Sequence, residues 1–75
     1  MNLYLISQTV NDDWDTYDSA VVAAIDAESA KRIHPSESSA ETCSWCKVKD
    51  VQVKLIGYAI PDTDQGVVLA SYNAG

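Results

Sequence analysis

The sequence predicts a single α+β domain with the element order ββαββ, in which one mostly antiparallel four-stranded sheet carries a single short helix packed on one face. The chain has 75 residues, enough for one domain over residues 1–75. Hydrophobic residues make up 47% and there are only 3 Gly and 2 Pro, a composition typical of globular proteins. Four apolar segments have strand character, and one helical segment separates the second from the third. The expected strands are residues 2–8, 18–25, 47–56 and 67–72.

The first two strands are apolar on both faces. Residues 2–8 alternate Tyr4 and Ile6 with leucines, which is typical of a strand buried on both sides. Residues 18–25 carry small side chains on both faces, so a helix or a neighbouring backbone can approach closely. Residues 9–17 are rich in turn-forming residues and predict a loop between two antiparallel strands.

A short helix follows the second strand. Asp26 has the short acceptor side chain of a helix N-cap, and Glu28 suits the positive end of the helix dipole. Pro35 ends the helix, because the residue before a proline is disfavoured in the helical region. The last turn should hold Lys31, Arg32 and His34, and the buried stripe should consist of Ala27, Ala30 and Ile33.

The third strand alternates apolar and polar side chains over residues 47–56, which predicts one buried and one solvated face. Val48 falls out of this alternation and indicates either a bulge near Asp50 or a later start of the strand. Gly57 is expected to break the strand.

The fourth strand, residues 67–72, follows a turn over residues 61–66. The spacing predicts that the third and fourth strands also form an antiparallel pair. An open sheet has two edge strands, and these offer sites for homodimerisation or for pairing with a partner.

The acidic composition restricts the possible partners. The chain carries 5 Lys+Arg against 11 Asp+Glu, for a formal net charge of −6, and residues 1–30 contain no Lys or Arg. This charge argues against direct binding to nucleic acid or to an anionic membrane. The N-terminal segment lacks the basic region of a signal peptide, and no apolar segment is long enough to span a bilayer, so a cytoplasmic location is expected.

No enzyme motif is evident. No Ser, Cys or carboxylate is spaced to form a nucleophile–base pair with the single histidine, and there is no phosphate-binding glycine loop. A deep catalytic cleft is also unexpected in a domain of this size. The sequence therefore predicts a non-enzymatic protein without a cofactor.

The candidate binding site is an acidic segment that includes two aromatic residues. Aromatic side chains supply contact area and carboxylates can pair with Arg or Lys, so the segment predicts a patch that binds a basic protein surface. Such a patch could place carboxylates where the phosphates of a nucleic acid would sit. The alternatives are a solvated loop and a calcium loop, although the glycine and distal glutamate of an EF-hand are missing. The expected partner-binding residues are Asp12, Asp13, Trp14, Asp15, Tyr17 and Asp18.

A second motif is the C-x-x-C pair formed by Cys43 and Cys46. Such a pair can supply half of a zinc site or form a redox couple. His34 is the one histidine available as a further ligand, so a closed zinc site would need a carboxylate or a second subunit. The alternative to such a zinc- or thiol-dependent module is a pair of thiols beside Trp45, which would anchor the loop.

Several segments resemble a family of small acidic hypothetical proteins of bacteria and their phages. They are LYLISQ (3–8), YDSAVVAA (17–24), RIHP (32–35), VKLIG (53–57) and GVVLASYNAG (66–75). The resemblance implies no catalytic residue. Many small acidic phage proteins inhibit host defence, anti-CRISPR proteins among them. By this analogy of size and charge, the expected function is inhibition of a host defence complex through its basic, nucleic-acid-binding surface, in the host cytoplasm if the protein is phage-encoded. A homodimeric cytosolic domain with another partner is the alternative.

Overall fold

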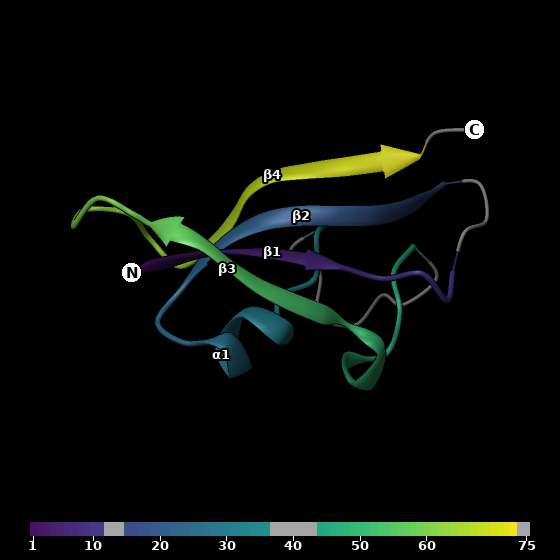
Figure 1. The fold of residues 1–75 in the computed structure, drawn as a ribbon. Helices are drawn as coiled ribbons and strands as arrows, with labels where there is room; N and C mark the ends of the chain where they lie inside the picture. The colour runs from purple at the N-terminus through teal and green to yellow at the C-terminus, as the bar shows by residue number, and fades with distance from the viewer. Residues whose placement is uncertain (12–14, 37–43, 74–75) are drawn as a thin grey trace.

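The computed structural model describes residues 1–11, 15–36 and 44–73. It confirms the α+β class and the order ββαββ, with one additional 3₁₀ helix before the third strand (Figure 1). The elements are β1 (Asn2–Ser7), β2 (Thr16–Ala24), α1 (Ala27–Lys31), the 3₁₀ helix Val48–Asp50, β3 (Gln52–Tyr58) and β4 (Gly66–Asn73).

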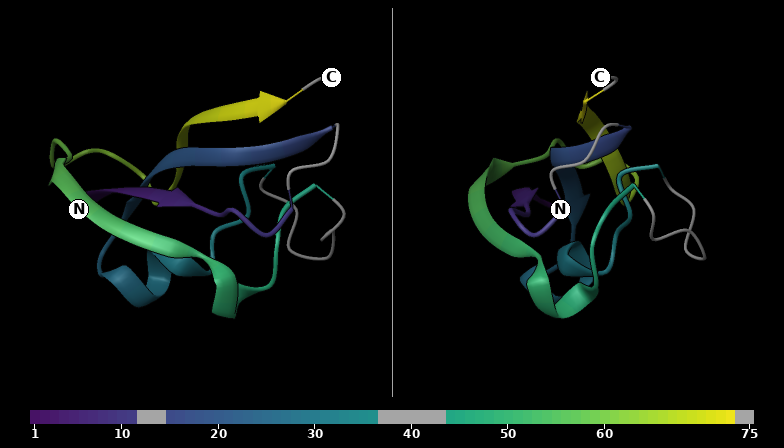
Figure 2. Two further views of the ribbon diagram at one scale, coloured as in Figure 1. Left: turned by 45° about the vertical axis from the view of Figure 1, so that its right-hand side comes forward. Right: turned by 90° about the vertical axis from the view of Figure 1, so that its right-hand side faces the viewer.

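The four strands form one antiparallel sheet in the order β3-β1-β2-β4. The predicted pairing of the first two strands is confirmed, with Asn2 opposite Ala24 and Ser7 opposite Ser19. The predicted pairing of the third and fourth strands is wrong, because β3 and β4 lie at opposite edges of the sheet (Figure 2). Strands that are apolar on both faces gain most from a neighbour on each side, so β1 and β2 take the two central positions.

The bounds of all four strands also differ from the predicted ones, most of all in β2 and β3. β2 begins at Thr16, inside the predicted loop, and β3 begins at Gln52, so the later start indicated by Val48 is confirmed. β3 continues through Gly57, which pairs with Leu3, so the predicted break at Gly57 is wrong. The register shifts just beyond this pair, where Ile56 is the extra residue of a bulge.

The core lies between one face of the sheet and the segments that cover it. The small residues Ala20 and Ala24 of β2 allow α1 to pack closely, and Ala30 of α1 is fully buried against them. Trp45, in the segment before the 3₁₀ helix, completes the core and is 4% exposed. Trp45 is thus buried as expected, whereas residues 37–43 of the loop that it was expected to anchor lie outside the described residues. The buried cluster consists of Tyr4, Ile6, Ala20, Val22, Ala24, Ala30, Trp45 and Val51.

The helix begins as predicted but ends early. Asp26 has extended backbone angles, and its Oδ1 accepts a hydrogen bond from the Ser29 N–H at 2.7 Å. The last turn tightens, because Arg32 N donates to Ser29 O and Ile33 N to Ala30 O, each three residues back. His34 therefore lies after the helix, and the predicted extension to Pro35 is wrong. Ala27 is exposed, which also contradicts its predicted place in the buried stripe.

Candidate partner-binding surface

The loop between β1 and β2 is held at its base by the buried side chain of Gln8, which is 4% exposed. Its Nε2 donates to the main-chain oxygens of Asn11 at 2.7 Å and Tyr17 at 2.9 Å. Its Oε1 accepts a hydrogen bond from the Asn11 N–H at 2.7 Å. The main-chain N–H of Gln8 donates to Asp18 O at 3.2 Å. One amide side chain therefore fixes both ends of the predicted binding segment.

The same base is tied to the segment that precedes the 3₁₀ helix. Asn11 Nδ2 donates to Trp45 O at 2.8 Å, and Tyr17 N donates to Ser44 O at 2.7 Å. Because Trp45 belongs to the core, these bonds connect the start of β2 directly to the packed interior. The carboxylates that flank Tyr17 thus project from a fixed support.

Three of the six predicted partner-binding residues lie in the described part of the structure. Asp12, Asp13 and Trp14 lie outside the described residues. Asp15 and Asp18 are exposed, as a partner-binding role requires. Asp15 has a positive φ of 62°, a left-handed conformation that aspartate tolerates better than most residues. Beyond it, the β2–β4 register shifts between Tyr17 and Ser19, so Asp18 lies in a bulge.

Tyr17 differs from its acidic neighbours because it is half-buried and packs against the core. Its ring contacts Tyr72 of β4 edge-on, with centroids 4.8 Å apart, and His34 with centroids 6.3 Å apart. His34 in turn lies 6.5 Å from Trp45. Four rings thus connect β4 to the core through Tyr17, which indicates a mainly structural role for this residue.

The predicted zinc or thiol site is only partly described. Cys43 lies outside the described residues, and Cys46 is a half-buried free thiol. Burial, followed by the charge of Asp50, raises the pKa of Cys46, the opposite of what a thiolate ligand or redox nucleophile needs. Within residues 1–11, 15–36 and 44–73, no group of three His, Cys, Asp or Glu side chains is arranged to hold a metal.

His34 is engaged locally. The Ser36 N–H donates to His34 Nδ1 at 3.0 Å, and Ser36 Oγ lies 2.8 Å from the same nitrogen. Since Nδ1 accepts a main-chain N–H, the proton of the neutral ring belongs on Nε2. This bond orients the ring in the aromatic row between Tyr17 and Trp45.

A hollow that the sequence did not indicate lies beside the anchored loop. It has a volume of about 310 Å³. Its lining residues are Val10, Asn11, Trp45, Cys46, Lys47, Lys49 and Asp50. Lys47 and Lys49 are exposed, and Asp50 partly balances their charge. The two lysines that follow the C-x-x-C pair are visible in the sequence. The sequence does not indicate that they lie close to Asn11, which is far from them along the chain.

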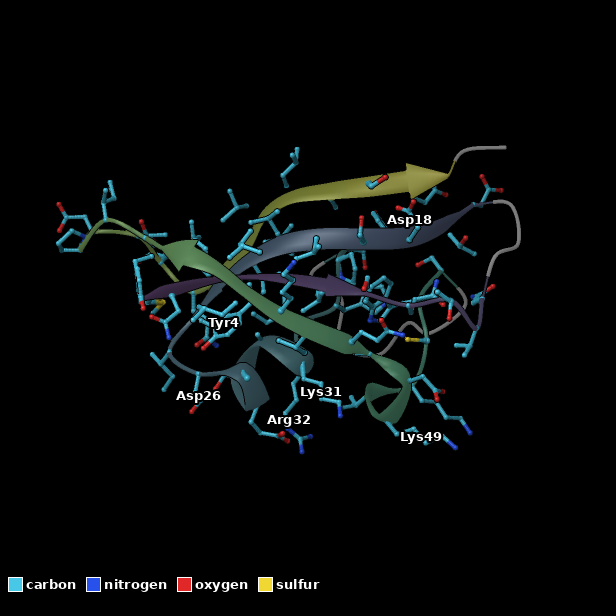
Figure 3. All side chains as sticks on the ribbon, in the orientation of Figure 1. Tyr4, Asp18, Asp26, Lys31, Arg32 and Lys49 are labelled. Carbon is cyan, nitrogen blue, oxygen red and sulfur yellow. The ribbon has the colours of Figure 1, made fainter. Side chains whose placement is uncertain are left out.

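Figure 3 shows how labelled charged residues are distributed over the fold. Lys31, Arg32 and Lys49 lie on α1, just after it and on the 3₁₀ helix, with Asp26 at the start of α1, whereas Asp18 lies on β2 beside β4. Arg32 forms an exposed ion pair with Glu28, at 2.9 Å, so its charge is matched locally. The exposed carboxylates of Asp15 and Asp18 have no such ion pair among the described side chains.

Comparison of the chain with protein-family models, curated proteins and solved structures finds no significant match. The resemblance to small acidic bacterial and phage proteins therefore stays a prediction. Among the described residues, no helix has the length and apolar character needed to cross a membrane.

Proposed function

We propose that the protein is a non-enzymatic binding domain that uses the acidic start of β2 to cover a basic surface of another protein. The specific proposal is a phage or mobile-element inhibitor of a host defence complex, similar in action to anti-CRISPR proteins. The observation that carries it is the pair of exposed carboxylates, Asp15 and Asp18, on a base fixed by Gln8.

Rigid support matters for this function because a binding surface that is already ordered loses less conformational entropy on association. Asp15 has its backbone set by a left-handed turn, and Asp18 lies on a strand whose main-chain oxygen accepts from Gln8. Both carboxylates can therefore meet arginine or lysine side chains without ordering of their own backbone.

The net charge of −6 adds a long-range contribution. Negative charge accelerates encounter with a basic partner, and this steering weakens as the salt concentration rises. A surface that binds nucleic acid is basic over a wide area, so carboxylates can compete there with phosphates. These are the properties that a protein inhibitor of a nucleic-acid-binding complex needs.

The first experiment measures plaque formation by a phage on CRISPR-immune bacteria that express the protein. Wild-type protein should restore plaques, and Asp15→Asn with Asp18→Asn should reduce this effect at least about tenfold, since each lost charge pair weakens binding. The matched control, Asp62→Asn with Asp64→Asn, removes two exposed charges from the turn before β4 and should restore plaques as the wild type does.

A second experiment tests the general mechanism without assuming the target. Tagged protein is used to capture partners from bacterial lysate at low and high salt, and captured proteins are identified by mass spectrometry. Basic nucleic-acid-binding proteins should be retained at low salt and lost from the Asp15/Asp18 double variant. Equal capture by both double variants would rule out the acidic-surface mechanism.

A further inference from the structure

We infer that two copies of the chain associate through β4, so that the two four-stranded sheets join edge to edge. β4 pairs with β2 on one side, and no described strand lies on its other side (Figure 1). In an edge strand, alternate residues turn their N–H and C=O groups outward, where another strand can pair with them.

The two edges of the sheet differ in their protection against such pairing. β3 carries the exposed Lys54 within its regularly paired part, Gln52–Leu55. A lysine on an edge strand opposes pairing because a second strand would have to bury or approach its charge. β4 contains no charged residue along its whole length, Gly66–Asn73.

The usable part of β4 is the stretch that follows Val68. The register with β2 shifts there, since Val67 pairs with Val22 and Leu69 with Val21, so Val68 is the extra residue of a bulge. Leu69, Ala70 and Ser71 then pair in regular succession with β2. This regular stretch could form a ladder centred near Ala70 with the same stretch of a second copy, so that the two copies of Leu69 lie diagonally across the axis from one another.

A second copy fits this edge because β4 itself contains no charged residue. A strand that pairs with its own copy about a two-fold axis is antiparallel, and any charged side chain near the axis would face the same charge. In a chain of net charge −6, the uncharged β4 avoids this repulsion. Its exposed apolar side chains also gain cover, since Leu69 is 68% and Tyr72 48% exposed.

The apolar surface continues from this edge onto the sheet. Leu69 lines a hollow of about 260 Å³ together with Leu5 and Val21, on the face away from α1. Contiguous exposed apolar surface of this kind is typical of interaction sites. The association therefore involves both the main chain of β4 and the leucine beside it.

The test is sedimentation velocity of the full chain from micromolar to millimolar concentration. The wild type should approach twice the monomer mass of 8.1 kDa as concentration rises. Leu69→Lys should raise the dimer dissociation constant at least about tenfold, because it places like charges across the axis. The control Leu55→Lys puts the same charge on the exposed face of β3 and should leave the constant unchanged. A wild type that stays monomeric throughout would overturn the inference.

Salt provides a second readout that separates dimerisation from the proposed function. Each copy carries −6, so added salt should strengthen the dimer by screening repulsion, whereas it should weaken binding to a basic partner. Nuclear Overhauser contacts between β4 of labelled and unlabelled copies should locate the pairing directly. A dimer that resists Leu69→Lys, or that shows contacts through β3, would contradict the use of β4.

Discussion

The side-chain amide of Asn11 donates to the main-chain oxygen of Trp45 at 2.8 Å, across 34 positions of the sequence. This bond connects the end of β1 with the segment that enters the 3₁₀ helix. Because Trp45 is buried and Asn11 is bonded to Gln8, the loop base, the core and the start of β2 form one connected unit. The stability of the sheet and the presentation of Asp15 should therefore depend on the same few contacts.

Replacing Gln8 tests this unit most directly. Gln8→Ala removes the part-buried bonds that its side chain forms with the Asn11 N–H and with the main-chain oxygens of Asn11 and Tyr17. It should lower the free energy of unfolding by about 2 kcal/mol. Gln52→Ala changes the same residue type at an exposed position of β3 and should have little effect. Urea unfolding followed by circular dichroism measures both, and equal losses would show that Gln8 is not a special support.

Trp45 should contribute more to stability than any surface aromatic residue. It is 4% exposed and lies in the core cluster, so Trp45→Ala should cost about 3 to 5 kcal/mol, enough to unfold much of a domain of this size. Tyr58→Ala truncates a ring that is 77% exposed and should change stability by less than about 0.5 kcal/mol. Thermal unfolding of the two variants distinguishes these outcomes. A folded Trp45→Ala variant of near wild-type stability would contradict the assigned core position.

The Asp26 cap should make helix stability depend on pH. Its bond from Ser29 N–H lowers the pKa of Asp26 below the ordinary value of 3.8. A carboxyl pKa that is lower in the folded chain stabilises the fold above 3.8, and this contribution disappears as pH falls through the folded-state value. The urea midpoint of Asp26→Asn should therefore be lower than that of the wild type at neutral pH, with the difference shrinking in acid.

Asp62→Asn serves as the control for this measurement, because Asp62 lies in an exposed turn and caps no helix. Its unfolding midpoint should stay close to that of the wild type at neutral pH. If Asp26→Asn and Asp62→Asn behave alike over the whole pH range, the cap does not contribute to stability as a charged group.

Cys46 should react slowly with alkylating reagents. Burial, with a smaller contribution from Asp50, raises the pKa of its thiol, so the reactive thiolate is scarcer at a given pH. In a Cys43→Ser background, the alkylation rate of Cys46 should rise on unfolding in urea. Asp50→Asn should also raise it, while Asp64→Asn should not. A thiol that reacts in the folded protein as fast as in the unfolded chain would contradict this.

Much of the fold was predictable because it depends on local signals. The alternation in β1, the small residues of β2 and the Asp26 cap each act within a few positions of the chain. The neighbour of β4 was not predictable in this way, because an intervening segment such as 59–65 can either return to β3 or pass to the other edge. That choice depends on the sheet as a whole, where buried β1 and β2 compete for central positions.

The candidate site was predictable only in its acidic residues. Asp15 and Asp18 are exposed, as expected for carboxylates of the predicted binding segment. Gln8 was missed because a glutamine at the end of a strand is ordinarily a surface residue, and its partners include Tyr17, nine positions away. The structural role of Tyr17 was missed for a related reason, since it depends on contacts with His34 and Tyr72.

The sheet order also constrains how this chain folds. Thr16 and Asn73 are opposite one another in the β2–β4 register although 57 positions separate them. The edge of β2 that faces away from β1 can therefore form its main-chain hydrogen bonds only after β4, the last strand, has been made. Contacts between such distant positions close large loops and slow folding. During synthesis, an incomplete sheet would leave the outer edge of β2 unpaired, and this is the stage at which the chain is most prone to aggregate.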